Sequence, residues 1–325
     1  MAGLLTSRTA SWRFSNRHRG FLLAMVLTLL CAGCTDSAAP GEVEMIWGRL
    51  GSRDGQFQKP RAMCIAPDDR IYVVDMTARV QAFTAQGEFV LSWKMPKFDT
   101  GKPTGINIDH DGNIMVADTH NFRVMIYTPN GEFIKQIGGE EGLEFGQFSL
   151  VTDCVQDSQG NYFISEYGVR DRIHKVSSDG QTVLAEYGEH GEELGNFRRP
   201  QSILMDENDH LWVADAVNHR IQVFDTTDEE SGFKLVKVIG QEGDKAGDLK
   251  YPYGLDFDTE GNLLVVEFGN HRVQKFSPEG KSLGIWGTHG RQQGQTHNPW
   301  GVGCDSNGRI HVLDTYNHRL QVIRL

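Results

Sequence analysis

The chain has 325 residues and a formal net charge of −11 at pH 7. Its first 20 residues hold Arg8, Arg13, Arg17 and Arg19 and no acid, so without these four arginines the charge is −15. Nucleic-acid affinity rests largely on Lys and Arg that neutralise phosphates, so this acidic composition excludes nucleic acid as the expected partner.

The first 33 residues have the organisation of an export signal. After the basic start, Phe21 to Gly33 form an apolar run that is too short to span a bilayer comfortably. The run ends Leu-Cys-Ala-Gly-Cys at residues 30–34, which resembles the bacterial lipoprotein cleavage box, although Cys31 stands where that box usually has Leu. The resemblance implies removal of residues 1–33 and lipidation of Cys34, and hence an exported protein anchored to a membrane of the cell envelope. Plain secretion and an organelle transit peptide remain the alternatives.

Beyond a tether at 34–44, one sequence pattern is repeated six times. The clearest copies are VADTHNFRVMIY (116–127), VADAVNHRIQVF (213–224), VVEFGNHRVQKF (265–276) and VLDTYNHRLQVI (312–323). Degraded copies begin at residues 73 and 164. Each copy is preceded by a proline or by the valine that replaces it: Pro60, Pro103, Val151, Pro200, Pro252 and Pro299. The spacings of 43, 48, 49, 52 and 47 residues indicate a propeller or a repeat array.

Each repeat contains four predicted strands. In the second repeat they are Gly105–Asp109, Ile114–Ala117, Arg123–Tyr127 and Glu132–Ile137, separated by turns rich in Asp, Asn and Gly. The sixth repeat stops after its third strand, whereas Met45-Ile46-Trp47-Gly48 matches the fourth strand of repeat five. We therefore predict an all-β fold, a six-bladed β-propeller over 45–325, in which the N-terminal strand completes blade six.

The repeats resemble the NHL family, which is named for an Asn-His-Leu motif. Here that motif is Asn-His-Arg at 218–220, 270–272 and 317–319. There is also a distant resemblance to the peptidyl-hydroxyglycine amidating lyases, which place a zinc-binding His directly after the proline in three blades. This chain has no His at any of the six positions, which are Arg61, Thr104, Thr152, Gln201, Tyr253 and Trp300. The zinc chemistry that the resemblance implies is therefore absent or rebuilt.

An acid and an arginine recur in every repeat. The pairs are Asp75 with Arg79, Asp118 with Arg123, Glu166 with Arg172, Asp215 with Arg220, Glu267 with Arg272, and Asp314 with Arg319. A catalytic pair occurs once in a protein, so six copies indicate structural ion pairs. We call them the rim pairs.

The first strand of each repeat borders the expected central channel. If alternate residues face inward, the second and fourth positions after the proline point into the channel and the third and fifth into the core. This register places Asp153, Asp256 and Asn107 in the channel as a possible oxygen-ligand site, better suited to calcium than to zinc. A solvated or hydrogen-bonded carboxylate is the plainer interpretation of Asp153.

Blades five and six add aromatic residues near the mouth of the channel. The six residues after the prolines should line this mouth, and Tyr251, Tyr253, Phe268, Trp300 and Tyr316 fall on it or on adjoining loops. Exposed rings beside polar groups are typical of sites that bind peptides or sugars. Packing between blades is the alternative for any single ring.

Two functions are compatible with these features. The first is a non-catalytic, membrane-anchored scaffold that binds a protein, peptide or glycan at the mouth, because no residues suggest a nucleophile, a base or a complete metal site. The second is an envelope lyase or hydrolase that uses a divalent ion in the channel. A propeller fold alone does not separate them.

Overall fold

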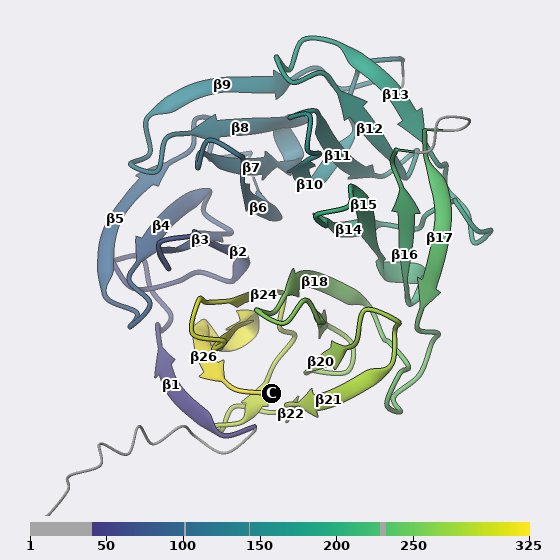
Figure 1. The fold of residues 1–325 in the computed structure, drawn as a ribbon. Coiled ribbons are helices and arrows are strands. Elements are labelled where there is room, and N and C mark those ends of the chain that lie inside the picture. Colours follow the sequence, from purple (N-terminus) through teal and green to yellow (C-terminus); the bar gives the residue numbers. More distant parts are fainter. Residues whose placement is uncertain (1–40, 101, 143, 228–231) are drawn as a thin grey trace, which may run out of the picture. The chain divides into compact units, whose positions relative to one another are not determined.

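The computed structural model describes residues 41–100, 102–142, 144–227 and 232–325, which lie in one compact unit, Ala38–Leu325. Six four-stranded antiparallel sheets are arranged as blades around a centre, as Figure 1 shows. This confirms the predicted six-bladed propeller. No helix among the described residues is long and apolar enough to cross a membrane. The export signal, Cys34 and residues 35–40 of the tether lie outside the described residues.

The first three blades follow the chain in order, each from its innermost to its outermost strand. Blade one consists of β2 (Pro60–Ile65), β3 (Ile71–Asp75), β4 (Arg79–Phe83) and β5 (Phe89–Lys94). Blade two consists of β6 (Gly105–Ile108), β7 (Ile114–Asp118), β8 (Arg123–Tyr127) and β9 (Phe133–Gly138), with a short 3₁₀ turn, η1 (Thr119–Asn121). Blade three consists of β10 (Leu150–Gln156), β11 (Tyr162–Tyr167), β12 (Arg172–Val176) and β13 (Val183–Tyr187).

The last three blades repeat this plan until the end of the chain. Blade four consists of β14 (Pro200–Met205), β15 (His210–Asp215), η2 (Ala216–Asn218), β16 (Arg220–Asp225) and β17 (Lys234–Ile239). Blade five consists of β18 (Pro252–Phe257), β19 (Leu263–Glu267), β20 (Arg272–Phe276) and β21 (Ser282–Trp286). A two-stranded linker, β22 (Thr288–His289) and β23 (Gln295–Thr296), leads to blade six: β24 (Gly301–Cys304), β25 (Ile310–Asp314), η3 (Thr315–Asn317) and β26 (Arg319–Ile323).

Blade six is completed by β1 (Val43–Trp47), which pairs antiparallel with β26. In Figure 1 the purple β1 runs beside the yellow β26, so the two ends of the propeller share one sheet. The predicted closure is confirmed, although the strand begins two residues before the expected Met45. Trp47 anchors it, since its ring centroid lies 4.7 Å from that of Phe83 in blade one.

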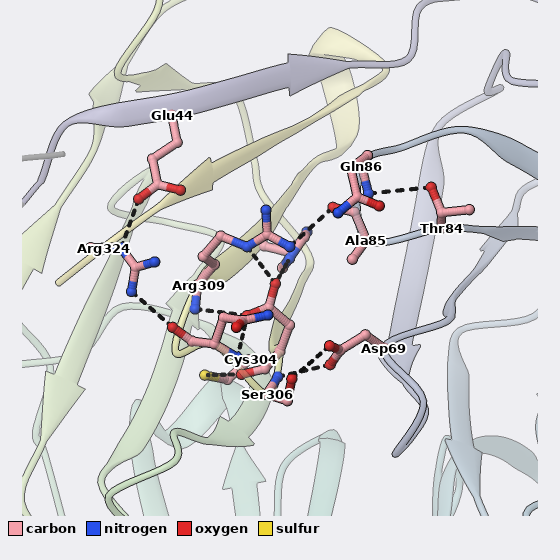
Figure 2. A network of polar contacts seen from close by, with 12 residues as sticks. Glu44, Asp69, Thr84, Ala85, Gln86, Cys304, Ser306, Arg309 and Arg324 are labelled. Atoms are coloured by element: carbon pink, nitrogen blue, oxygen red, sulfur yellow. Dashed lines mark hydrogen bonds and ion pairs between the residues drawn. The ribbon is translucent and has the colours of Figure 1, made fainter. Parts of the chain in front are cut away.

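Polar contacts join blade six to blade one and hold the N-terminal segment in blade six (Figure 2). Asp69 of blade one accepts hydrogen bonds from the backbone N–H of Ser306 at 2.8 Å and from its hydroxyl at 2.6 Å. Arg324 Nε donates to Glu44 Oε1 of the N-terminal segment at 2.7 Å. The ring is therefore sealed without a covalent bond, by a paired strand and by charged side chains.

All six rim pairs are present, with N–O distances from 2.5 to 3.2 Å. The acids are buried, and the guanidinium groups also donate to carbonyl groups of the linkers between blades. Arg220, for example, donates to Asp215 at 2.7 Å and to the carbonyls of Glu193 and Asn196. The predicted structural ion pairs are therefore confirmed, and each pair also ties its blade to the preceding linker.

Candidate functional site

The innermost strands follow the predicted register in part. Ala62 and Cys64 pack in the core between blades one and two, whereas Met63 and Ile65 pack against residues of blade six. Side chains stand perpendicular to their sheet, so a radially placed blade directs both sets toward its neighbours and turns only a strand edge to the centre. The expectation holds for the second positions, all six of which border the cavity at the centre, but of the fourth positions only Asn107 does so.

Close approach between blades explains why many second positions are small. A Cβ atom added to Gly105 would lie 2.3 Å from the carbonyl oxygen of Thr152, and one added to Gly254 would lie 2.5 Å from that of Trp300. Both separations are well below van der Waals contact. These glycines are therefore required by packing and do not indicate a space reserved for a ligand.

The side chains directly after the prolines point in another direction, because the hydrogen-bond pairing between the first two strands is irregular there. A register shift spans Arg61, Gln201 and Tyr253 where their strands begin to pair. A bulge leaves such a residue outside the ladder and changes the direction of its side chain. These three residues, with Thr104 and Trp300, line a cavity at the centre with a volume of about 30 Å³. Ligand pockets usually measure several hundred Å³, so only a small group can enter.

Thr152 does not join them. Its hydroxyl lies 2.7 Å from that of Ser165 and donates to the carbonyl of Pro200 at 2.5 Å, and the side chain is fully buried. Thr104 donates to the carbonyl of Thr152 at 3.2 Å while it borders the cavity. Thr152 is thus a link between blades three and four.

Asp153 is the hub of a hydrogen-bond network across three blades. Its Oδ1 accepts from the Asn107 side chain at 2.8 Å and from the Cys154 N–H at 3.0 Å. Its Oδ2 accepts from the Ser202 hydroxyl at 3.0 Å and the Ile203 N–H at 3.1 Å. Burial raises the pKa of Asp153 to about 7, against the lowering effect of these donors. Both oxygens are therefore already engaged by the protein.

Asp256 makes a separate link between blades five and six. It accepts from the Phe257 N–H at 2.9 Å and from the Cys304 N–H at 2.8 Å, and desolvation raises its pKa to about 7. Asp256 does not line the cavity, so the structure brings together Asn107 and Asp153 only. Among the described residues no three His, Cys, Asp or Glu side chains are placed to hold a metal ion.

The predicted aromatic residues of blades five and six form one cluster. Tyr253 stacks on Phe268 with ring centroids 4.6 Å apart, and Trp300 meets both rings edge-on at 4.9 and 5.8 Å. Phe268 also contacts Tyr316, at 6.3 Å. Tyr253 and Trp300 are only 7% and 8% exposed, whereas Tyr316 is 39% exposed. Within the cluster, Tyr253 and Trp300 are thus buried, and Tyr316 forms the exposed edge.

Tyr251 lies to the side of this cluster. Its ring packs edge-on against His219 at 4.5 Å, and its backbone N–H donates to His219 Nδ1 at 3.1 Å. His271 and His318 accept in the same way from the N–H groups of Asn298 and Lys59. These donors precede the prolines and have positive φ values, so the histidines hold a strained backbone where blades five, six and one begin. The histidine of the repeat motif is therefore structural.

Two of the residues directly before the prolines are cations near the mouth rings that the sequence analysis did not identify. Lys59 and Arg199 both precede a proline at positive φ. The ammonium of Lys59 lies 5.1 Å from the Tyr316 ring, and the Arg199 guanidinium lies 4.9 Å from Tyr167 and 5.2 Å from Tyr253. The only sequence signal was their place before Pro60 and Pro200.

Arg61 completes this group, with its guanidinium 5.3 Å from the Trp300 ring. No ion pair among the described residues involves Lys59, Arg61 or Arg199, in contrast to the rim arginines. Desolvation is the main cause that lowers the pKa of Arg61, and the charge of Arg199 contributes. We call the cavity and its surrounding rings and cations the mouth: Lys59, Arg61, Tyr167, Arg199, Gln201, Tyr253, Phe268, Trp300 and Tyr316.

The chain resembles known proteins in its repeats. A profile described as the NHL repeat matches residues 197–224, 249–276 and 296–323. NHL repeat-containing protein 3 of Homo sapiens is 25% identical over 205 residues, 59% of this chain and 56% of that protein. A probable peptidyl-alpha-hydroxyglycine alpha-amidating lyase of Caenorhabditis elegans is 24% identical over 56% of this chain and 57% of its own length. The chain thus spans little more than half of these two relatives.

Solved structures agree on the fold. An auxiliary nutrient binding protein from Bacteroides thetaiotaomicron superposes with a TM-score of 0.63 at 15% sequence identity, covering 82% of this chain and 69% of that one. At this identity the likeness concerns architecture alone. The sequence matches and the observed blades lead to one conclusion: the chain carries NHL repeats, and it folds as a six-bladed β-propeller.

Proposed function

We propose that this protein is a membrane-anchored scaffold in the cell envelope that binds a protein, peptide or glycan at the propeller mouth. The observation that carries the proposal is a group of three cations, Lys59, Arg61 and Arg199, which lie over aromatic rings and have no acid as a partner in the part of the chain that the structure describes. An unpaired, partly buried charge costs stability, so its retention favours a role outside the fold. Rings and arginines are also the residues most enriched at binding hot spots.

The metal-dependent lyase or hydrolase is the weaker alternative. Likeness to an amidating lyase favours it, but the carboxylates expected to bind an ion are engaged between blades, and the lyase's zinc histidines are replaced. Elemental analysis of the purified protein separates the two proposals. A stoichiometric divalent ion that is lost, together with activity, in Asp153→Asn would favour the enzyme.

Tyr316→Ala is the sharpest test of binding at the mouth. Tyr316 is the exposed edge of the cluster, so its truncation should leave the melting temperature nearly unchanged and weaken capture of the ligand from an envelope extract. Phe133→Ala is the matched control, because Phe133 is an exposed ring on the outer strand β9. Equal capture by both variants and the wild type would contradict binding at the mouth.

Anchoring is tested by Cys34→Ser. A thiol accepts the acyl group in the proposed modification and a hydroxyl does not replace it, so the variant should leave the membrane fraction for the soluble envelope fraction. Each buried CH₂ of an acyl chain contributes about 0.8 kcal/mol to membrane binding. Unchanged fractionation of the variant would rule out this anchor.

A further inference from the structure

The mouth contains hydrogen-bond donors with nothing to donate to. The Nε2 atom of Gln201 and the Nε1 atom of Trp300 are buried and have no partner among the described residues. Gln201 and Trp300 are 1% and 8% exposed, and both line the central cavity. Buried polar groups are almost always hydrogen-bonded, so two orphaned donors beside one cavity indicate a missing acceptor.

The orientation of the Gln201 amide follows from its neighbour. Arg199 Nε can only donate, and it lies 3.0 Å from the Gln201 side-chain oxygen, which must therefore accept. This leaves the NH₂ group of Gln201 as the orphan. Trp300 Nε1 is a donor in every state, so neither group can be satisfied by another donor.

The guanidinium groups add further free donors and positive charge. With the described residues Arg61 makes only one, long hydrogen bond from its side chain, from Nη1 to the carbonyl of Lys102 at 3.4 Å. Arg199 uses Nε for Gln201, and no hydrogen bond among the described residues uses its two terminal nitrogens. The pKa of Arg61 is lowered first by desolvation and further by repulsion from the positive charge of Arg199. An anion between the two arginines would relieve this repulsion.

We propose that the mouth binds a carboxylate group of its ligand, held by Arg61, Arg199, Gln201 and Trp300. A carboxylate accepts only, carries the compensating charge and matches the planar fork of arginine. A cavity of about 30 Å³ admits such a small planar group, whereas a sugar ring or a peptide segment must remain outside, against Tyr316 and Phe268. This inference rests on the proposed function and specifies the chemistry of its ligand.

The experiment titrates the purified full chain with N-acetylglycine and glucuronate, which carry a carboxylate on a peptide-like and a sugar body. N-acetylglycinamide and glucose are the uncharged counterparts, and inorganic phosphate at equal ionic strength tests a tetrahedral anion. Binding is measured by calorimetry and by the ligand-induced rise in melting temperature. We expect at least one carboxylate to bind and its uncharged counterpart not to bind.

Arg61→Gln and Arg199→Gln should each weaken carboxylate binding by about tenfold or more, as expected for a lost charge-assisted hydrogen bond. Arg70→Gln is the control, because Arg70 lies at the far end of the β2–β3 hairpin and pairs with Asp68. Arg61→Lys keeps the charge but not the fork, so it should bind more weakly than the wild type while it folds normally.

Three outcomes would overturn the proposal: equal binding of the uncharged counterparts, binding of phosphate alone, or unchanged affinity in Arg61→Gln and Arg199→Gln. The wider function is judged separately by capture from the extract. Loss of capture in Tyr316→Ala without any carboxylate binding would retain the mouth as a binding site and reject the carboxylate.

Discussion

The arginines at the rim and at the mouth contrast in their partners. Arg220 at the rim donates to Asp215 and to two linker carbonyls, whereas Arg61 at the mouth lies over Trp300 and donates to one distant carbonyl. The rim arrangement occurs in all six blades and the mouth arrangement does not. The same type of side chain therefore stabilises the ring in one place and, in our proposal, binds the ligand in the other.

The largest effect on thermal stability should come from removing the strand that closes the ring. Deleting residues 43–48 removes β1 and with it Trp47, which contacts Phe57 and Phe83. Because the deletion removes both a partly buried ring and the strand paired with β26, the melting temperature should fall by about 10 °C or more. Deleting residues 35–40 removes the same number of residues from the tether and should leave it unchanged. Equal melting temperatures of the two deletions would contradict the closure.

A rim arginine and a mouth arginine should differ in the sign or size of their effect on stability. Arg220→Gln leaves buried Asp215 without its cation and should cost about 3–5 kcal/mol. Arg61→Gln removes an unpaired, desolvated charge, so its effect should lie within about 0.5 kcal/mol or be stabilising. Chemical denaturation measures both. Similar losses in the two variants would remove the distinction between rim and mouth.

The buried carboxylate of Asp153 should make the free energy of unfolding fall as the pH rises. Because the folded pKa of Asp153 is raised from 3.8 to about 7, the native state binds more protons than the unfolded state between these values. The contribution of Asp153 to the free energy of unfolding is fully present below about pH 4 and is lost as the pH rises through 7. Its upper limit is about 4 kcal/mol. Asp256 is partly exposed, so its contribution should be smaller.

Asp153→Asn provides the matched control for this pH effect. The difference in unfolding free energy between wild type and variant should shift in favour of the wild type as the pH falls from 8 to 5. A difference that does not change with pH would show that Asp153 has an ordinary pKa in the folded protein.

The scaffold could be predicted from the sequence because each of its features recurs. The repeated turn residues predicted the strands, the six acid–arginine pairs predicted the rim pairs, and the match of residues 45–48 to the fourth strand of repeat five predicted the closing strand. The mouth could be predicted only in part, since Tyr253 and Trp300 followed from the repeat but Arg199 and Lys59 did not. Their direction depends on positive φ values before the prolines, which the repeat pattern does not reveal. The channel register was right for the second positions, but most fourth positions pack between blades, because the inward direction depends on how the blades are turned about the centre.

The central claim is that the unpaired cations of the mouth serve a ligand. Its most direct test compares Arg61→Gln with Arg70→Gln in two assays on the full chain: thermal unfolding without ligand and capture of the envelope ligand. We predict that both variants unfold close to the wild-type temperature and that only Arg61→Gln loses capture. Full capture by Arg61→Gln, or a marked fall in its melting temperature with capture retained, would contradict the claim.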